Sequence, residues 1–148
     1  MSRKKSLLPR EVFLSHSAKD RLFVERLARV LQGHGVPFWY SGTNIVGARE
    51  WHAEIGQALA RCDWFLLVLS PHSIKSPWVE RELLYALIDA RYRNRIIPVL
   101  WRSCNPMTLS WTLGGFQLVD FTAGFEKGCR NLLRVWGIGY KGARAGRH

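Results

Sequence analysis

The chain of 148 residues is 47% hydrophobic, which suits one globular domain with a sizeable core and leaves no room for a second domain. Its formal net charge of +11 raises nucleic acid as a partner, because clustered Lys and Arg gain affinity by releasing phosphate counterions. The basic residues are dispersed rather than clustered, so we expect nucleic acid to be bound only indirectly if at all, and a solvated surface or an anionic partner domain explains the charge as well.

The first part of the chain predicts a strand, a helix and a second strand. Residues 11–16 are a short apolar run, and Ser17 and Asp20 have the spacing of a capping box, which opens a helix. The apolar face of this helix carries Phe23, Leu27, Val30 and Leu31. Residues 33–35 end the helix, since glycine takes the left-handed closing conformation, and residues 36–40 form the second strand.

A polar, glycine-bearing loop, residues 41–49, leads into a second helix with one apolar stripe. The stripe consists of Trp51, Ile55, Ala58 and Leu59. Residues 64–69 are hydrophobic throughout, which indicates a strand buried on both faces, as in a parallel sheet. The third helix begins after Ser76, a suitable N-cap that is followed by proline, and runs to about Arg93.

The last part of the chain completes an alternation of strands and helices. Residues 96–101 predict a fourth strand, residues 102–116 are irregular, and residues 117–121 predict a short fifth strand. The final helix is amphipathic through Phe125, Cys129, Leu132, Leu133 and Trp136. This order indicates an α/β fold with a doubly wound parallel sheet and right-handed crossovers. Ligands bind such sheets beyond the carboxyl ends of the strands.

Four short motifs follow one another along the chain. They are residues 13–17 with Asp20, residues 38–40, residues 45–51 with the apolar stripe after them, and residues 69–83. In this order they are similar to the motifs of Toll/interleukin-1 receptor (TIR) domains of the bacterial type, and the resemblance covers residues 11–137. The chain departs from the family pattern at Ser41, where an acidic residue is usual, and at Val79, where a cysteine is usual.

The resemblance implies the TIR fold, a flavodoxin-like sheet of five parallel strands flanked by helices. Residues 1–10 then form a basic leader and residues 138–148 a flexible basic tail. Residues 137–142 match the dinucleotide fingerprint G-x-G-x-x-G, but that motif needs a strand before it and a helix after it. Here it follows a predicted helix, so we assign it to the tail.

Glu82 is the candidate catalytic residue. Trp78 and Glu82 lie four residues apart in the third helix and share one side of it, beside an apolar stripe. That stripe consists of Val79, Leu83, Ala86, Leu87 and Ala90. Glu80 points about 160° away, at roughly 100° per residue. In TIR domains that cleave NAD+, a glutamate four residues after this tryptophan is catalytic, and the resemblance carries that role to Glu82. The helix dipole alone also favours an acid at this position.

The remaining site residues are expected at the same edge of the sheet. The substrate-binding candidates are Trp78, Phe38 and Trp39 as a flat wall for nicotinamide, Ser15, Ser70 and Ser73 for ribose or phosphate, and Arg49 for the pyrophosphate. Phe38 and Trp39 alternate along a strand, so only one of them can face the site. Trp78 has the alternative role of a packing residue.

Neither a metal nor a cofactor is expected, with NAD+ as the substrate. His16, His34, His52 and His72 lack the spacing of metal ligands. The three cysteines are Cys62, Cys104 and Cys129, and their odd number and irregular spacing are typical of reduced thiols in a cytoplasmic protein. No apolar run approaches the roughly 18 residues of a membrane span, so we expect no membrane partner.

Two functions follow from the resemblance. The first is an NAD+ nucleosidase, a glycohydrolase or ADP-ribosyl cyclase, that serves as an effector of bacterial anti-phage defence and is activated by a sensor partner or by self-assembly. The assembly loop would include Ser41, Gly42, Ile45 and Gly47, and would contact other TIR domains. The alternative is a non-catalytic module that only binds other TIR domains. The pair Trp78 and Glu82 favours the enzyme.

Overall fold

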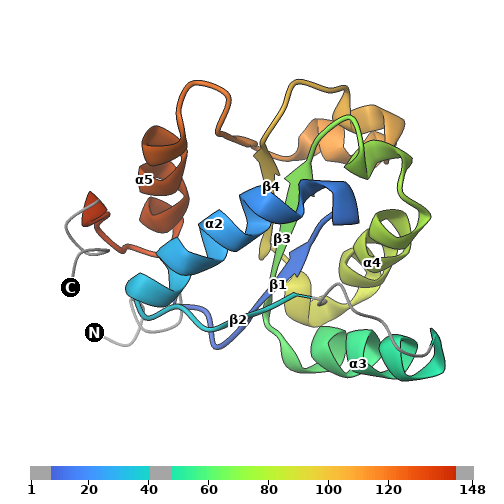
Figure 1. Ribbon diagram of the computed structural model, residues 1–148. Helices are drawn as coiled ribbons and strands as arrows, with labels where there is room; N and C mark the ends of the chain where they lie inside the picture. The colour runs from blue at the N-terminus through green and yellow to red at the C-terminus, as the bar shows by residue number, and fades with distance from the viewer. Residues whose placement is uncertain (1–7, 41–47, 143–148) are drawn as a thin grey trace.

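The computed structural model describes residues 8–40 and 48–142, with the backbone alone for residues 48–51. Five parallel strands form one sheet in the order β2-β1-β3-β4-β5 (Figure 1). They are β1 (Val12–Ser15), β2 (Phe38–Trp39), β3 (Trp64–Leu69), β4 (Ile96–Leu100) and β5 (Val119–Asp120). The connecting helices are α2 (Arg21–Gly33), α3 (Ala48–Arg61), α4 (Pro77–Ile88) and α5 (Phe125–Val135). This order confirms the predicted flavodoxin-like, doubly wound fold.

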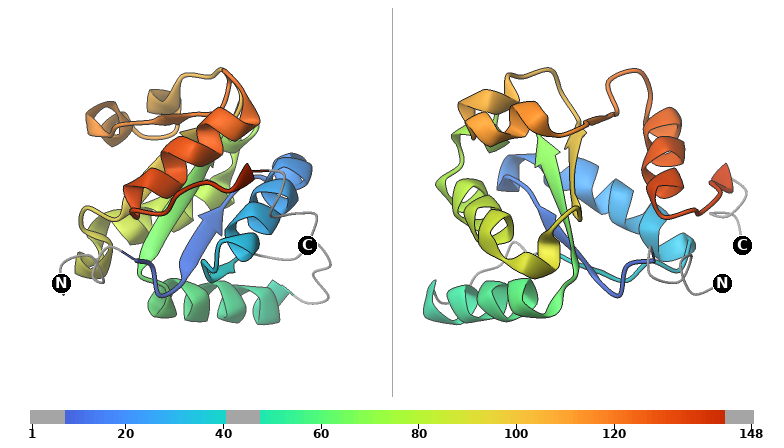
Figure 2. Two further views of the ribbon diagram at one scale, coloured as in Figure 1. Left: turned by 90° about the vertical axis from the view of Figure 1, so that its left-hand side faces the viewer. Right: turned by 180° about the vertical axis from the view of Figure 1, so that it is seen from behind.

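The helices cover both faces of the sheet (Figure 2). One core lies under α2 and α5, where Val12 and Leu14 of β1 point. A second core lies under α3 and α4 and receives Phe13 from the same strand. Every residue of β3 is buried, which confirms the prediction from its continuous hydrophobicity. None of the helices described is both long and apolar enough to cross a membrane.

The start of α2 differs in one detail from a capping box. The Ser17 hydroxyl accepts the backbone N–H of Lys19, as an N-cap should, and the chain then makes a 3-10 turn, Ala18–Asp20, before α2 begins. The Asp20 carboxylate does not return to the cap but accepts a hydrogen bond from Ser70 after β3. Gly35 closes the helix with a φ of 73°, as predicted.

Helix α4 begins as predicted and ends earlier. Ser76 caps it by accepting the N–H of Val79, but the helix stops at Ile88 instead of continuing to Arg93. Asp89 has an extended backbone, and its carboxylate accepts the N–H of Arg91, which starts a separate 3-10 turn. The prediction that Ala90 belongs to the core stripe was therefore wrong. Ala90 is exposed, and the turn brings Tyr92 into the core instead.

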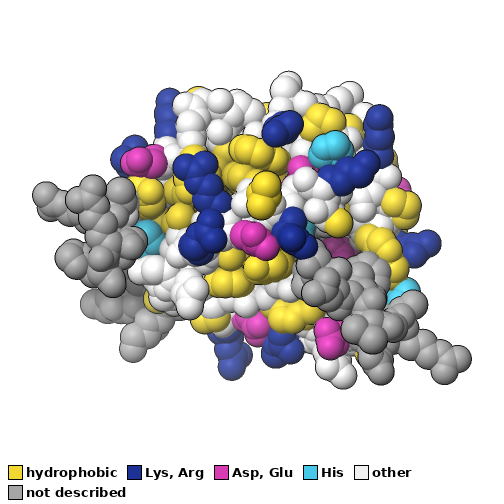
Figure 3. Space-filling model, in the orientation of Figure 1, with side chains coloured by type: hydrophobic (Ala, Val, Ile, Leu, Met, Phe, Trp, Pro, Cys, Tyr) yellow, Lys and Arg dark blue, Asp and Glu magenta, His cyan; other side chains and the backbone are white. Residues whose placement is uncertain are grey.

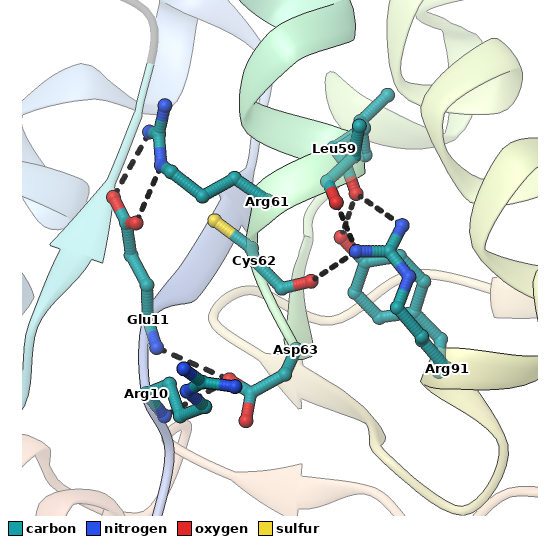
Figure 4. A network of polar contacts seen from close by, with 9 residues as sticks. Arg10, Glu11, Leu59, Arg61, Cys62, Asp63 and Arg91 are labelled. Atoms are coloured by element: carbon teal, nitrogen blue, oxygen red, sulfur yellow. Dashed lines mark hydrogen bonds and ion pairs between the residues drawn. The ribbon is translucent and has the colours of Figure 1, made fainter.

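A network of charged side chains, which we call the amino-edge network, joins the starts of β1 and β3 to neighbouring loops (Figure 4). The Arg61 guanidinium donates to both oxygens of Glu11, at 2.6 and 3.0 Å. The Asp63 carboxylate accepts two backbone N–H groups, from Arg10 and Glu11, and pairs with Arg95. Arg91 donates to carbonyl groups at the end of α3, where it acts as a C-terminal cap.

Candidate functional site

Buried polar side chains gather at the opposite edge of the sheet, beyond the carboxyl ends of the strands. Among the residues described, the buried polar or charged ones are Ser15, Ser17, Asp20, Ser70, Ser73 and Glu82. All six lie at the ends of β1 and β3, in the loops that follow them, or at the start of α4. Burial of polar groups is costly unless they are bonded, so such a concentration marks a candidate site.

Glu82 is the centre of this group. It lies in the second turn of α4, where helix packing brings its carboxylate against the end of β1. The Ser15 hydroxyl donates a hydrogen bond of 2.7 Å to Oε1 of Glu82, and Glu82 is only 7% exposed. Burial raises the pKa of Glu82 to about 7, and the Ser15 hydrogen bond opposes that rise because it favours the charged form.

This carboxylate has no cationic partner in the part of the chain that the structure describes. A glutamate whose pKa lies near 7 exists in both protonation states at neutral pH. Such a group can accept a proton or stabilise a nearby positive charge without a further change in pH. The site therefore holds a carboxyl group that can act as a base or stabilise a positive charge at physiological pH.

Trp78 lies one turn before Glu82 on the same side of α4. Its ring meets the ring of His52 from α3 edge-on, with centroids 4.5 Å apart, and the guanidinium of Arg81 lies 5.4 Å from its centroid. Trp78 is only partly buried, so it combines packing between α3 and α4 with an accessible aromatic surface. The contact with His52 was not predicted, because it depends on how the two helices pack.

The two aromatic residues of β2 point to opposite faces of the sheet, as their alternation predicts. Trp39 stacks on Phe13 at 5.3 Å and packs on the α3 and α4 face, which also carries Ser15 and Glu82. Phe38 packs on the other face and stacks with Tyr40 at 6.0 Å. The structure therefore places Trp39, and not Phe38, on the face of the sheet that carries Glu82.

Ser70 and Ser73 hold a loop together and are turned away from solvent. Both are fully buried. The Ser70 hydroxyl donates to Asp20 at 2.5 Å and accepts the N–H of Ser73, while the Ser73 hydroxyl accepts the N–H of Ser70. In this arrangement neither hydroxyl is exposed, so contact of either one with ribose or phosphate stays a prediction. The buried carboxylate of Asp20 was missed as a member of this group, since its partner is 50 residues away in the sequence.

Several candidates lie outside the described residues. These are the assembly-loop residues Ser41, Gly42, Ile45 and Gly47, together with the side chain of Arg49 and most of the basic leader and tail. Within the described ranges, no group of three or more His, Cys, Asp or Glu side chains is arranged to hold a metal ion.

Comparison with known proteins identifies the family. The family model described as TIR domain matches residues 12–133. A solved TIR domain, from a Toll-related receptor of Hydra magnipapillata, superposes with a TM-score of 0.68 at 21% identity and covers 84% of this chain and 96% of its own. A prokaryotic SEFIR domain superposes with a TM-score of 0.57 at 15% identity, covering 86% of this chain and 98% of its own.

Curated relatives come from bacteria. A protein named NAD(+) hydrolase PdTIR, from Paracoccus denitrificans, is 32% identical over 62% of this chain and 31% of its own length. A protein named 2' cyclic ADP-D-ribose synthase BtTIR, from Bacteroides thetaiotaomicron, is 24% identical over 62% of this chain and 32% of its own length. The chain thus spans about a third of the curated relatives it matches. Because the family model covers most of the chain and the fold agrees with it, the chain belongs to the TIR domain family.

Proposed function

We propose that this TIR domain cleaves NAD+ at the bond between nicotinamide and ribose, with Glu82 as the catalytic carboxylate. The observation that carries the proposal is the buried Glu82 carboxylate, which is held by Ser15 and has a pKa of about 7. The relatives named as an NAD(+) hydrolase and as a cyclic ADP-D-ribose synthase support the substrate. No metal and no further cofactor enters the proposed reaction.

The chemistry requires only one carboxylate. The nicotinamide of NAD+ carries a positive charge, so when its bond to ribose breaks, the electron pair goes to the ring nitrogen and neutral nicotinamide leaves without a general acid. Positive charge then develops on the ribose as an oxocarbenium ion, and the ionised Glu82 stabilises it. Attack by water gives ADP-ribose and releases one proton, which Glu82 can accept. Attack by a hydroxyl group of the same molecule gives a cyclic product instead.

The neighbours of Glu82 have supporting roles in this proposal. Ser15 orients the carboxylate through its 2.7 Å hydrogen bond and keeps part of it ionised. Trp78 and Trp39 offer aromatic surfaces on the same face of the sheet for the nicotinamide ring. Residues 41–49 would complete the site when copies of the domain assemble, and a sensor partner in anti-phage defence would trigger that assembly.

The test is loss of NAD+ and release of nicotinamide, measured by chromatography with the protein clustered on beads. We expect Glu82→Gln to lower the rate by about 100- to 1,000-fold, the usual cost of removing one group that stabilises transition-state charge. Glu80→Gln is the matched control, because this exposed glutamate lies on the same helix two residues away. Full activity of Glu82→Gln would reject the proposed role. Absence of turnover by the clustered wild type would favour the non-catalytic interaction module.

A further inference from the structure

A second feature of the carboxyl edge is a cleft of about 460 Å³, which we call the basic cleft. Its lining comes from two loops. Ser17 and Lys19 come from the loop after β1, and Pro71, His72, Lys75 and Ser76 come from the segment between β3 and α4. Figure 3 shows a histidine beside Lys or Arg side chains at the upper right of the face in view, the end of the molecule toward which β1 and β3 run.

The cleft carries positive charge that no neighbouring acid neutralises. Lys19 and Lys75 are exposed, and neither forms an ion pair with any residue in the described ranges. No Asp or Glu lines the cleft. The nearby carboxylate of Asp20 is only 4% exposed and is already bonded to Ser70. The two lysines therefore make an electropositive surface whose charge remains available to a ligand.

Two hydroxyl groups in the cleft have donor capacity left. Ser17 Oγ accepts the N–H of Lys19 at 3.2 Å, and Ser76 Oγ accepts the N–H of Val79 at 3.3 Å. In both bonds the serine is the acceptor, so each hydroxyl proton remains to be donated. Ammonium groups together with hydroxyl donors match the oxygens of a phosphate, which accept several charge-assisted hydrogen bonds at once.

The basic cleft is also tied to the proposed catalytic group. Ser17 follows Ser15 by two residues, and Ser76 caps the helix whose second turn carries Glu82. The cleft is thus built from the same two segments that position the Ser15–Glu82 pair. The cleft and Glu82 therefore lie at the same edge of the sheet.

We infer that the basic cleft binds a phosphate group through Lys19 and Lys75, with the hydroxyls of Ser17 and Ser76 as additional donors. The phosphate belongs either to the diphosphate of the dinucleotide substrate, which rests on the proposed function, or to a separate phosphate-bearing ligand. The inference assigns phosphate binding to these residues instead of Ser70 and Ser73, whose hydroxyls are hydrogen-bonded within their loop.

The binding test uses inorganic pyrophosphate and does not need activity. The whole chain, labelled with ¹⁵N, is titrated with pyrophosphate, and the dissociation constant is read from amide shifts of Ser17, Lys19, Lys75 and Ser76. The double substitution Lys19→Gln with Lys75→Gln should weaken binding by about tenfold or more, since each lost bond is to a charged group. Both lysines are exposed, so the variant should keep the wild-type melting temperature.

The matched control is Lys127→Gln with Lys141→Gln, two exposed lysines within and after α5, the helix that covers the other face of the sheet. It removes the same two charges and should leave the dissociation constant unchanged. Amide shifts that spread over the whole basic surface on addition of pyrophosphate would overturn the inference. So would binding that the control and the Lys19/Lys75 substitution weaken equally. Such a result would mean non-specific attraction to a cationic protein.

A kinetic arm separates the two sources of phosphate. If the cleft holds the diphosphate of NAD+, pyrophosphate should compete with NAD+, and the double variant should raise KM with little change in kcat. If pyrophosphate binds in the cleft but does not compete with NAD+, and the Lys19/Lys75 variant leaves the KM for NAD+ unchanged, a separate phosphate ligand occupies the cleft. If the chain does not turn over NAD+ at all, the proposed function fails, whereas lysine-dependent pyrophosphate binding would still establish the site.

Discussion

The two edges of the sheet hold their charged groups in opposite ways. At the amino edge, acids and arginines form pairs near the surface, such as Glu11 with Arg61 and Asp63 with Arg95. At the carboxyl edge, Glu82 is buried and bonded only to the neutral hydroxyl of Ser15 among the residues described. Paired surface charges cost little and contribute modestly to stability, whereas an unpaired buried carboxylate costs free energy. The carboxyl edge therefore keeps a group that lowers the stability of the fold, which agrees with the proposed catalytic role of Glu82.

The largest expected effect is on the buried acid itself. Because the pKa of Glu82 in the folded chain, about 7, lies above its value of about 4.3 in an unfolded chain, folding favours the protonated form. Stability from this group is fully present below about pH 4 and is lost as pH rises through 7. Glu82→Gln removes this loss, so the variant should be more stable than wild type by about 3 to 4 kcal/mol at pH 8.5.

Urea unfolding at pH 5 and at pH 8.5 measures this prediction. The gain from Glu82→Gln should be small at pH 5 and largest at pH 8.5, and Glu80→Gln, a substitution at an exposed position of the same helix, is the control. A Glu82→Gln variant that is less stable than wild type at pH 8.5 would mean that the carboxylate stabilises the fold, contrary to the comparison of the two edges.

A smaller effect of opposite sign is expected at the amino edge. Asp63→Ala leaves the backbone N–H groups of Arg10 and Glu11 without their acceptor and removes the partner of Arg95. We expect a loss of about 1 to 2 kcal/mol in the free energy of unfolding, because hydrogen bonds to a charged group are lost. NAD+ cleavage by the folded variant should stay within about twofold of wild type. A large loss of cleavage with an intact fold would show that the two edges are coupled.

Ser15→Ala should change the pH dependence of cleavage more than it changes stability. The Ser15 hydroxyl favours the ionised form of Glu82, so its removal should raise the pKa of Glu82 further. In the proposed reaction the ionised form of Glu82 is the active one, so wild-type activity should increase with pH through about 7, and the midpoint for Ser15→Ala should lie at higher pH. Initial rates between pH 5.5 and 9 measure both profiles. A midpoint that is unchanged or lower would exclude the proposed role of Ser15.

The smallest effect is expected from Arg61→Gln. Its ion pair with Glu11 has good two-point geometry, but about half of the Arg61 side chain is exposed to solvent. Exposed pairs of this kind contribute about 0.2 to 1 kcal/mol, and salt screens them. The difference between variant and wild type should therefore shrink in 1 M NaCl. A loss well above 1 kcal/mol would place Arg61 in a more tightly coupled network than its exposure indicates.

The sequence by itself determined the features that depend on neighbouring residues. The unbroken apolar run of β3, the cap formed by Ser76 and the spacing of Trp78 and Glu82 follow from local periodicity and capping chemistry. The order of these elements was sufficient to predict the parallel, doubly wound sheet that the structure confirms. Helix α4 ends before Asp89, whose side chain accepts the backbone N–H of Arg91. The apolar periodicity of the sequence does not reveal this local hydrogen bond.

Only the tertiary structure decided which side chains meet at the carboxyl edge. The hydrogen bond from Ser15 to Glu82 joins residues 67 apart, and the bond from Ser70 to Asp20 joins residues 50 apart. Both depend on the register of β1 beside β3 and on how α4 packs on the sheet, which no local pattern fixes. The same packing buried Glu82 and raised its pKa, because desolvation is a property of the whole fold rather than of the residue.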